Sequence, residues 1–141
     1  MTTPKPGFVV AADRDRAYDY VTSFFGLSRT EHQKGLIQLK DDEIIAAVVY
    51  DDFNGSNIFM HCAGKPGSKW LTRWFLHEAF KYPFITLGAK RITLWIETAN
   101  APSIRFAEHL GFKCEATLER AAAKGGDVVV YRMFREECRY A

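Results

Sequence analysis

The chain has 141 residues, a length typical of one domain, and we expect residues 1–141 to form a single domain. Hydrophobic residues make up 48% of the sequence and its formal net charge is +2, which excludes a chain that is disordered throughout and gives no strong support for binding to nucleic acids or membranes. The 3 cysteines show no tight spacing and the N-terminus has no signal-like apolar run, so we expect reduced thiols, no metal site and a cytoplasmic location.

The first half of the chain predicts one helix among several strands. Asp13 can cap the helix, and Gly26 stands where the helix would end. Residues 44–49 are apolar on both faces, which is typical of a central strand that is covered on both sides. The expected elements are a strand at 8–11, a helix at 13–25, a hairpin of strands at 35–39 and 43–50, and a strand at 58–62.

The second half predicts two helices between strands. A glycine-containing loop at 64–68 leads into the first helix, which Pro83 is expected to end. Asn100 and Gly111 are suited to cap the second helix at its two ends. The expected elements are helices at 69–81 and 100–110 and strands at 91–97, 112–118 and 128–134. The unit from 58 to 97 is strand, loop, helix and strand, and the start of its helix is a potential anion site.

Two segments carry a resemblance to a known superfamily. Residues 93–97, 100–106 and 108–112 read TLWIE, NAPSIRF and EHLGF, and this strand, helix and Leu-Gly-Phe turn resembles the GNAT N-acetyltransferases. The tail at 126–133, GDVVVYRM, is similar to the last strand of the branch that includes the ribosomal-protein N-terminal acetyltransferases. The resemblance covers nearly the whole chain and is weakest over residues 1–30.

The resemblance implies both a fold and an activity. The fold is α/β (α+β): a central mixed, mostly antiparallel sheet of about six or seven strands, with a splayed parallel pair and flanking helices. The activity is acetyl-CoA-dependent transfer of an acetyl group to a primary amine, by direct attack in a ternary complex. In the family, the pantetheine arm of acetyl-CoA pairs with the first splayed strand; here the splayed strands are 58–62 and 91–97. The residues implied to bind acetyl-CoA are Met60, His61, Cys62, Gly67, Ser68, Lys69, Trp70, Asn100, Ser103 and Phe106.

The phosphate-binding loop departs from the family pattern. The usual loop is Gln/Arg-x-x-Gly-x-Gly/Ala, whereas residues 63–68 read AGKPGS, and Pro66 removes an amide donor. Amides at 67–70 can still face the pyrophosphate at the start of the expected helix, and Lys65 and Lys69 add positive charge. We therefore expect the loop to retain an anion site despite its different sequence.

The usual catalytic acid is also missing. Many family members have a tyrosine that protonates the departing thiolate, and this chain has Ala107 at that position. A thiolate whose conjugate thiol has a pKa near about 8.5 is a fair leaving group without help. Tyr131 and Tyr140 are alternative acids, although nothing in the sequence places either hydroxyl at the sulfur.

Two residues are candidates for the general base that takes a proton from the amine. Glu97 ends the expected strand 91–97 and shares a face with Thr93 and Trp95, while His61 lies on the opposite splayed strand. Glu97 is the preferred candidate because some protein N-terminal acetyltransferases have a glutamate at the matching strand position. Cys62 lies near the expected thioester, but no nearby base supports a covalent route.

The acceptor amine and the partners are less defined by the sequence. Peptide, polyamine and small-molecule amines all fit, and the ribosomal-protein resemblance favours a peptide. The paired carboxylates of Asp41 with Asp42 and Asp51 with Asp52 are expected in solvated turns, where they could attract a cationic amine. The apolar last strand could pair with that of a second copy to form a homodimer. The alternative functions are a degenerate module that binds acetyl-CoA or a protein without catalysis, and a transferase acting on RNA through Lys65, Lys69 and Arg73.

Overall fold

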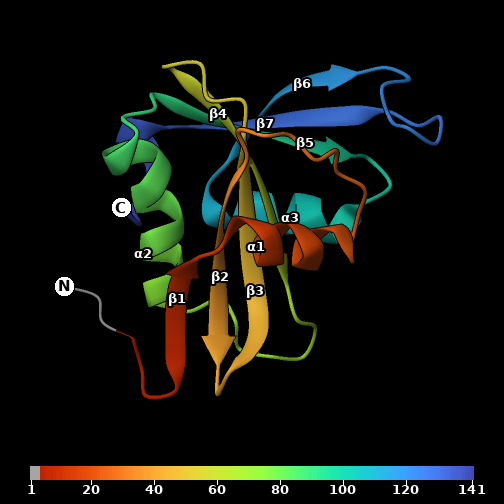
Figure 1. The fold of residues 1–141 in the computed structure, drawn as a ribbon. Coiled ribbons are helices and arrows are strands. Elements are labelled where there is room, and N and C mark those ends of the chain that lie inside the picture. The colour runs from red at the N-terminus through yellow and green to blue at the C-terminus, as the bar shows by residue number, and fades with distance from the viewer. Residues whose placement is uncertain (1–3) are drawn as a thin grey trace.

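The structure, a computed structural model, describes residues 4–141 and contains a seven-stranded sheet in the order β1-β2-β3-β4-β5-β7-β6 (Figure 1). All neighbouring strands are antiparallel except β4 and β5, so the mixed, mostly antiparallel sheet that the sequence predicts is confirmed. The elements are β1 (Phe8–Ala12), α1 (Arg14–Thr22), β2 (Lys34–Lys40), β3 (Glu43–Asp51), β4 (Asn57–Gly64), α2 (Arg73–Lys81), η1 (Tyr82–Thr86), β5 (Arg91–Glu97), α3 (Ala101–Leu110), β6 (Lys113–Leu118), β7 (Val128–Phe134) and η2 (Arg135–Glu137).

The parallel strands β4 and β5 separate soon after they begin. Their register contains only the pairs Asn57 with Arg91, Ile58 with Ile92 and Phe59 with Thr93. Beyond these pairs β4 continues to Gly64 and β5 to Glu97 without facing each other. In Figure 1, β2 and β3 run up and down the page whereas β5 and β7 run across it. The splayed parallel pair predicted from the sequence is therefore confirmed.

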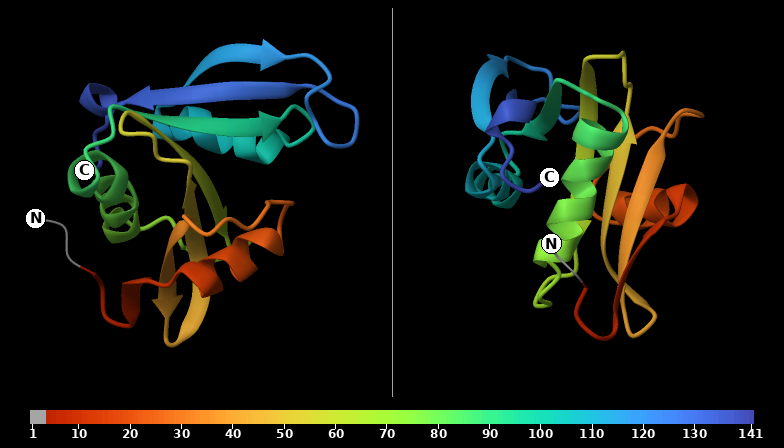
Figure 2. Two further views of the ribbon diagram at one scale, coloured as in Figure 1. Left: turned by 45° about the horizontal axis from the view of Figure 1, so that its top comes forward. Right: turned by 90° about the vertical axis from the view of Figure 1, so that its left-hand side faces the viewer.

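Helices cover the two faces of the sheet unequally. Helix α1 packs on β2 and β3 from one side, and α2 and α3 lie on the other side, as Figure 2 shows. Residues 45–51 of β3 are all buried, so the prediction of a central strand covered on both faces is confirmed. No helix in residues 4–141 is long and apolar enough to cross a membrane.

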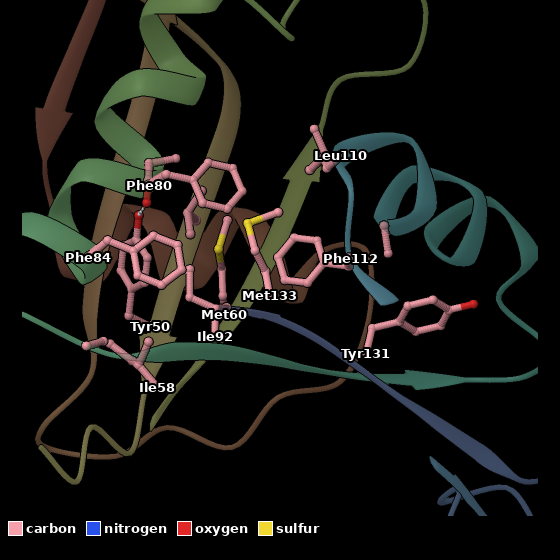
Figure 3. Packing of buried hydrophobic residues seen from close by; sticks show 14 of the residues in the cluster. Tyr50, Ile58, Met60, Phe80, Phe84, Ile92, Leu110, Phe112, Tyr131 and Met133 are labelled. Atoms are coloured by element: carbon pink, nitrogen blue, oxygen red, sulfur yellow. Dashed lines mark hydrogen bonds between the residues drawn. The ribbon is translucent and has the colours of Figure 1, made fainter. Parts of the chain in front are cut away.

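The larger core lies between the sheet and helices α2 and α3. Phe80 and Phe84 from the α2 region meet Met60 of β4, Ile92 of β5 and Met133 of β7 (Figure 3). Burial of such side chains contributes roughly 1.5–3 kcal/mol each relative to exposure. This cluster connects the two splayed halves of the sheet on the side of α2 and α3. A separate, smaller cluster packs on the α1 side.

Helix α1 is shorter than the sequence predicts. Asp13 caps its start as expected, with its side chain accepting a hydrogen bond from the Arg16 amide. The helix ends at Thr22 rather than at Phe25, and Ser23, not Gly26, occupies the C-cap position. The hydroxyls of Thr22 and Ser23 donate to main-chain carbonyls of the last turn, which stabilises the helix end at this point.

Helix α2 begins at Arg73, four residues later than the predicted start at Lys69. Its cap is Thr72, whose hydroxyl oxygen accepts a hydrogen bond from the Phe75 amide at 3.1 Å. The fully buried Gln38 of β2 fixes the preceding segment, because its amide group donates to the Trp70 carbonyl at 2.6 Å and accepts from the Thr72 hydroxyl at 2.7 Å. These long-range bonds hold residues 70–72 outside the helix.

Pro83 ends the α-helix, but the chain does not leave the helical path there. Helix α2 stops at Lys81, and the wider π turn η1 follows, with the Leu87 amide donating to the Tyr82 carbonyl at 3.0 Å. A proline lacks the amide of a regular α-helix, and a wider turn accommodates its ring. The turn places Phe84 in the core.

Candidate active site

A groove of about 1150 Å³ lies between the β1–β2 end of the sheet and the start of α2. No acidic side chain among the described residues lines it. Its basic residues are Lys5, Lys40, Lys69 and Arg73, and its aromatic residues are Phe8, Trp70, Trp74 and Phe106. Positive charge beside aromatic rings suits a ligand that has phosphate groups and a planar base.

The start of α2 gives this groove free amide donors. Arg73 and Trp74 are the first two helical residues, and their amides have no acceptor within the helix. The helix dipole adds partial positive charge at the same end. Because the helix starts late, the amides at 67–70 precede the helix instead of standing in its first turn. The Ser68 amide instead donates to the Lys65 carbonyl at 3.2 Å.

The residues predicted in the phosphate loop lie partly in the groove. Ser68, Lys69 and Trp70 line it, whereas Gly67 is absent from its lining among the described residues. Lys65 forms an ion pair with Glu43, so its charge is partly neutralised. Lys5 and Lys40 were missed by the sequence analysis because they come from the N-terminal segment and β2, which the family motif does not include.

The indole of Trp70 covers the end of β4. A Cβ atom added to Gly64 would lie 1.9 Å from Cε2 of this indole, so the ring rests directly on the glycine backbone. The Trp70 and Phe106 ring centroids are 5.3 Å apart, which connects the loop to α3. The indole therefore forms one wall of the groove and lies against the end of β4.

Met60 and Cys62 face the large core from β4. Met60 is buried, and Cys62 packs against the same cluster. Burial raises the pKa of the Cys62 thiol to about 12. A thiol in this environment stays protonated at neutral pH and is a poor nucleophile, which agrees with the lack of support for a covalent route in the sequence.

His61 and Asp51 form a pair on the opposite, α1 side of the sheet. Nε2 of His61 lies 2.9 Å from Oδ2 of Asp51, and the two side chains are 17% and 8% exposed. The prediction that Asp51 lies in a solvated turn is wrong, because this residue ends β3 and is buried. It continues the face of Val49, which stands opposite His61 across the β3–β4 pair. The alternation of side chains along a strand places Asp51 on the same face as Val49, and this pattern could have indicated the burial of Asp51 from the sequence.

Glu97 lies apart from this pair. It is the last residue of β5, it pairs with Val128 of β7, and it is partly exposed. It stands four residues beyond Thr93, the last β5 residue paired with β4, which corresponds to roughly 13 Å along the strand. His61 stands two residues beyond Phe59, or roughly 7 Å. Of the two candidate bases, His61 is nearer the vertex of the splay.

Helix α3 forms as predicted at both ends. Asn100 caps it, with Oδ1 accepting from the Ser103 amide at 3.3 Å, and Gly111 ends it in the left-handed conformation at φ 103°. Phe106 reaches the groove, whereas neither Asn100 nor Ser103 is part of the groove lining in residues 4–141. Ala107 is buried, so no polar group occupies the usual position of the acid.

Both alternative tyrosines are bound elsewhere on α3. The Tyr131 hydroxyl donates to Glu108 at 2.9 Å and points away from the core cluster in Figure 3. Burial, with Glu108 beside the hydroxyl, raises the pKa of Tyr131 to about 12. The Tyr140 hydroxyl donates to the Leu110 carbonyl at 3.1 Å. Neither hydroxyl is free to act as an acid without losing its partner.

A seven-stranded mixed sheet that opens between its parallel strands defines the class of fold as GNAT. Comparison with solved structures agrees. The chain is similar to a variant of the spermidine N-acetyltransferase SpeG from Vibrio cholerae, with a TM-score of 0.76 and 14% identity over 94% of this chain and 96% of the other. A dodecameric structure of the Vibrio cholerae enzyme gives a TM-score of 0.75 at 14% identity, over 94% and 96% of the two chains.

A third structure, the Vibrio cholerae spermidine/spermine N-acetyltransferase SpeG in complex with manganese ions, gives a TM-score of 0.74 at 14% identity, over 92% of this chain and 94% of the other. No protein-family model and no curated protein sequence matches the chain. The comparisons therefore confirm the GNAT fold that the sequence resemblance implies. They give no support for the ribosomal-protein branch in particular.

Proposed function

We propose that the protein is an acetyl-CoA-dependent N-acetyltransferase that acetylates a primary amine by direct attack in a ternary complex. The observation that carries the proposal is the separation of β4 and β5 after Phe59 and Thr93, together with a groove at the start of α2 whose charged side chains are all basic in the described chain. The free edge of β4 can pair with an extended ligand, and the groove can bind its phosphates. Acetyl-CoA combines both features.

The acetyl donor is a substrate that spans the two parts of the site. Its pantetheine arm would follow β4 along Met60, His61 and Cys62, where backbone amides on the free strand edge can polarise the thioester carbonyl. Its phosphates would face the first amides of α2, with Lys69 and Arg73 beside them. The predicted contacts of Gly67, Ser68, Trp70, Asn100, Ser103 and Phe106 remain part of the proposal.

His61 is the preferred general base in this mechanism. The amine nitrogen bonds to the carbonyl carbon, the bond from that carbon to sulfur breaks, and the electron pair leaves with the sulfur of CoA. An ammonium acceptor releases two protons: His61 takes one and passes it to solvent, and the other ends on the CoA thiolate. The products are the N-acetylamine and CoA. Because that thiolate is a fair leaving group, the site does not require an acid in place of Ala107.

Glu97 is the alternative general base, and substitution of each residue in turn distinguishes it from His61. We expect His61→Ala to lower kcat by about 100-fold or more with little change in the KM for acetyl-CoA, because general-base catalysis contributes on this scale. The matched control is His32→Ala, since His32 is highly exposed. If Glu97→Gln lowers kcat by this amount and His61→Ala does not, Glu97 is the base instead.

The fold neighbours and the sequence favour different acceptor classes. The matched structures are spermidine N-acetyltransferases, which favours a polyamine, and the resemblance of the last strand favours a peptide amine. Purified protein should therefore be tested with acetyl-CoA and a panel that contains spermidine, spermine and short peptides with free N-termini. Mass spectrometry of an acetylated product, with release of CoA, would support the proposal. No product with any amine would contradict it.

A binding module without catalysis is the second candidate function. Two observations favour it: the Trp70 indole lies on Gly64 at the end of β4, and Ala107 replaces the acid. Such a module would bind acetyl-CoA but transfer no acetyl group. Binding measured by calorimetry, together with the product assay, distinguishes the two functions.

A further inference from the structure

We infer that Asp51 is a positioning residue, whose buried carboxylate holds His61 as the Nε2–H tautomer and leaves Nδ1 as the proton-accepting atom. The inference rests on the proposed function for its catalytic meaning, because His61 is the base proposed there. The observation that carries it is the contact of 2.9 Å between His61 Nε2 and Asp51 Oδ2 on the α1 side of the sheet.

The roles of the two groups in this close contact follow from their chemistry. An ionised carboxylate can only accept hydrogen bonds, so a neutral imidazole in contact with it must donate from the nitrogen that it presents. That nitrogen is Nε2. The lone pair of the neutral ring is then on Nδ1, and only this atom can take a proton from an amine.

The surrounding structure limits rotation of the His61 ring. Asp51 and His61 are diagonal neighbours across the antiparallel pair of β3 and β4, where the registered pairs are Val49 with His61 and Asp51 with Phe59. The Phe25 ring, from the segment after α1, approaches with its centroid 6.5 Å from that of the imidazole. Two strands and one aromatic side chain thus set the orientation of the imidazole.

Stability does not explain an aspartate at this position. Oδ1 of Asp51 is buried and has no hydrogen-bond partner in the described part of the chain. An unpaired oxygen on a buried carboxylate disfavours the folded state. The neighbouring Asp52 is exposed, so a carboxylate needed only for solubility could stand there. The position of Asp51 is instead suited to a group that acts on His61.

The test compares Asp51→Asn with Asp52→Asn as the matched control. Asparagine keeps the shape of aspartate but has an amide that can donate to Nε2, which would turn the ring to the Nδ1–H tautomer. We expect Asp51→Asn to lower kcat for acetyl transfer by at least about tenfold while the KM for acetyl-CoA changes less than about twofold. The control should match the wild-type protein in both constants.

The tautomer of the His61 ring is a readout that would not change if Asp51 had only a structural role. Nitrogen-15 NMR of the imidazole, with the His61 signals assigned by their loss in His61→Gln, should show Nε2–H in the wild-type protein and a shift toward Nδ1–H in Asp51→Asn. The melting temperature of Asp51→Asn should not fall below that of the control, because the substitution removes a buried charge.

Three results would overturn the inference: an unchanged tautomer in Asp51→Asn, a kcat equal to that of the Asp52→Asn control, or a loss of kcat that only accompanies a loss of folded protein. The double variant of Asp51→Asn in a His61→Ala background should show no further loss, since Asp51 acts through His61. A wild-type protein that acetylates no amine would remove the catalytic role together with the proposed function. The tautomer would then still show whether Asp51 holds the ring.

Discussion

Glu137, near the C-terminal end of the chain, accepts hydrogen bonds from three sides. Its carboxylate accepts from the Phe134 amide at 2.9 Å and from Arg132 at 2.8 Å, and Lys113 lies 3.0 Å away. The Phe134 amide first, then Lys113 and Arg132, lower the pKa of Glu137 from 4.5 to about 2. These contacts tie β7 and β6 to the turn η2 that follows them.

The lowered pKa of Glu137 predicts a dependence of stability on pH. A carboxyl whose pKa is lower in the folded state stabilises that state above its unfolded pKa, and the contribution is lost as the pH falls toward the folded value. We expect the wild-type protein to lose melting temperature more steeply than Glu137→Gln between about pH 4.5 and about pH 2. The exposed neighbour provides the control Glu136→Gln, which should follow the wild-type curve. Parallel curves for wild type and Glu137→Gln would contradict the assignment.

At the residue scale, the sequence predicts side chains that act locally and misses those that act across strands. The cap residues Asp13, Asn100 and Gly111 bond within one helical turn, so their spacing predicts them. The burial of Asp51 depends on its partner His61 on another strand, and a pair of adjacent aspartates otherwise indicates a turn. Lys5 and Lys40 reach the groove only because the fold brings the N-terminal segment and β2 to the start of α2.

At the scale of elements, the close contact between β4 and the loop before α2 is open to a direct test. A Cβ atom on Gly64 would lie within 2.3 Å of several indole atoms of Trp70. We expect Gly64→Ala to lower the free energy of unfolding by roughly 1–3 kcal/mol, because the added methyl group overpacks this contact. Denaturant unfolding, with the midpoint and slope both fitted, provides the measurement.

Gly26→Ala is the matched control for this substitution. An added Cβ at Gly26 meets no atom within 4 Å, so we expect its free energy of unfolding to equal or slightly exceed that of the wild-type protein. Equal unfolding free energies for Gly64→Ala and Gly26→Ala would show that the indole moves away from β4 without cost. That result would contradict the conclusion that the Trp70 indole is held in place against β4.

The order of elements could be predicted from the sequence, whereas the limits of two helices could not. Strand β5 and helix α3 have the predicted residues, because apolar periodicity and caps define them locally. The late start of α2 depends on Gln38, which bonds to Trp70 and Thr72 from a strand more than 30 residues away in the chain. No local pattern around Lys69 contains that information, so the first amides of the helix are those of Arg73 and Trp74 rather than those expected at 67–70.

At the scale of the whole molecule, one sheet has two halves that part between β4 and β5. The large core of Phe80, Phe84 and Met133 joins the halves on the side of α2 and α3. On the other side, His61 lies two residues beyond the last β4–β5 pair and contacts Asp51 of β3. The basic groove lies at the start of α2, where we propose that the phosphates of the acetyl donor bind, and the proposed base lies on β4. The sequence resemblance predicted this fold. Which side chains of β3 and β4 face the large core, and which face α1, could be assigned only from the register of the strands.

Binding of acetyl-CoA is the most direct test of this account, and isothermal titration calorimetry measures it. We expect the wild-type protein to bind acetyl-CoA with a Kd of about micromolar order, which corresponds to roughly −8 kcal/mol. The double variant Lys69→Glu with Arg73→Glu should bind at least about tenfold more weakly, because both charges line the groove where we propose that the phosphates bind. The exposed Lys124→Glu, in the turn between β6 and β7, should bind as the wild type does. Absence of binding to the wild-type protein at millimolar acetyl-CoA would contradict the proposed site and the function built on it.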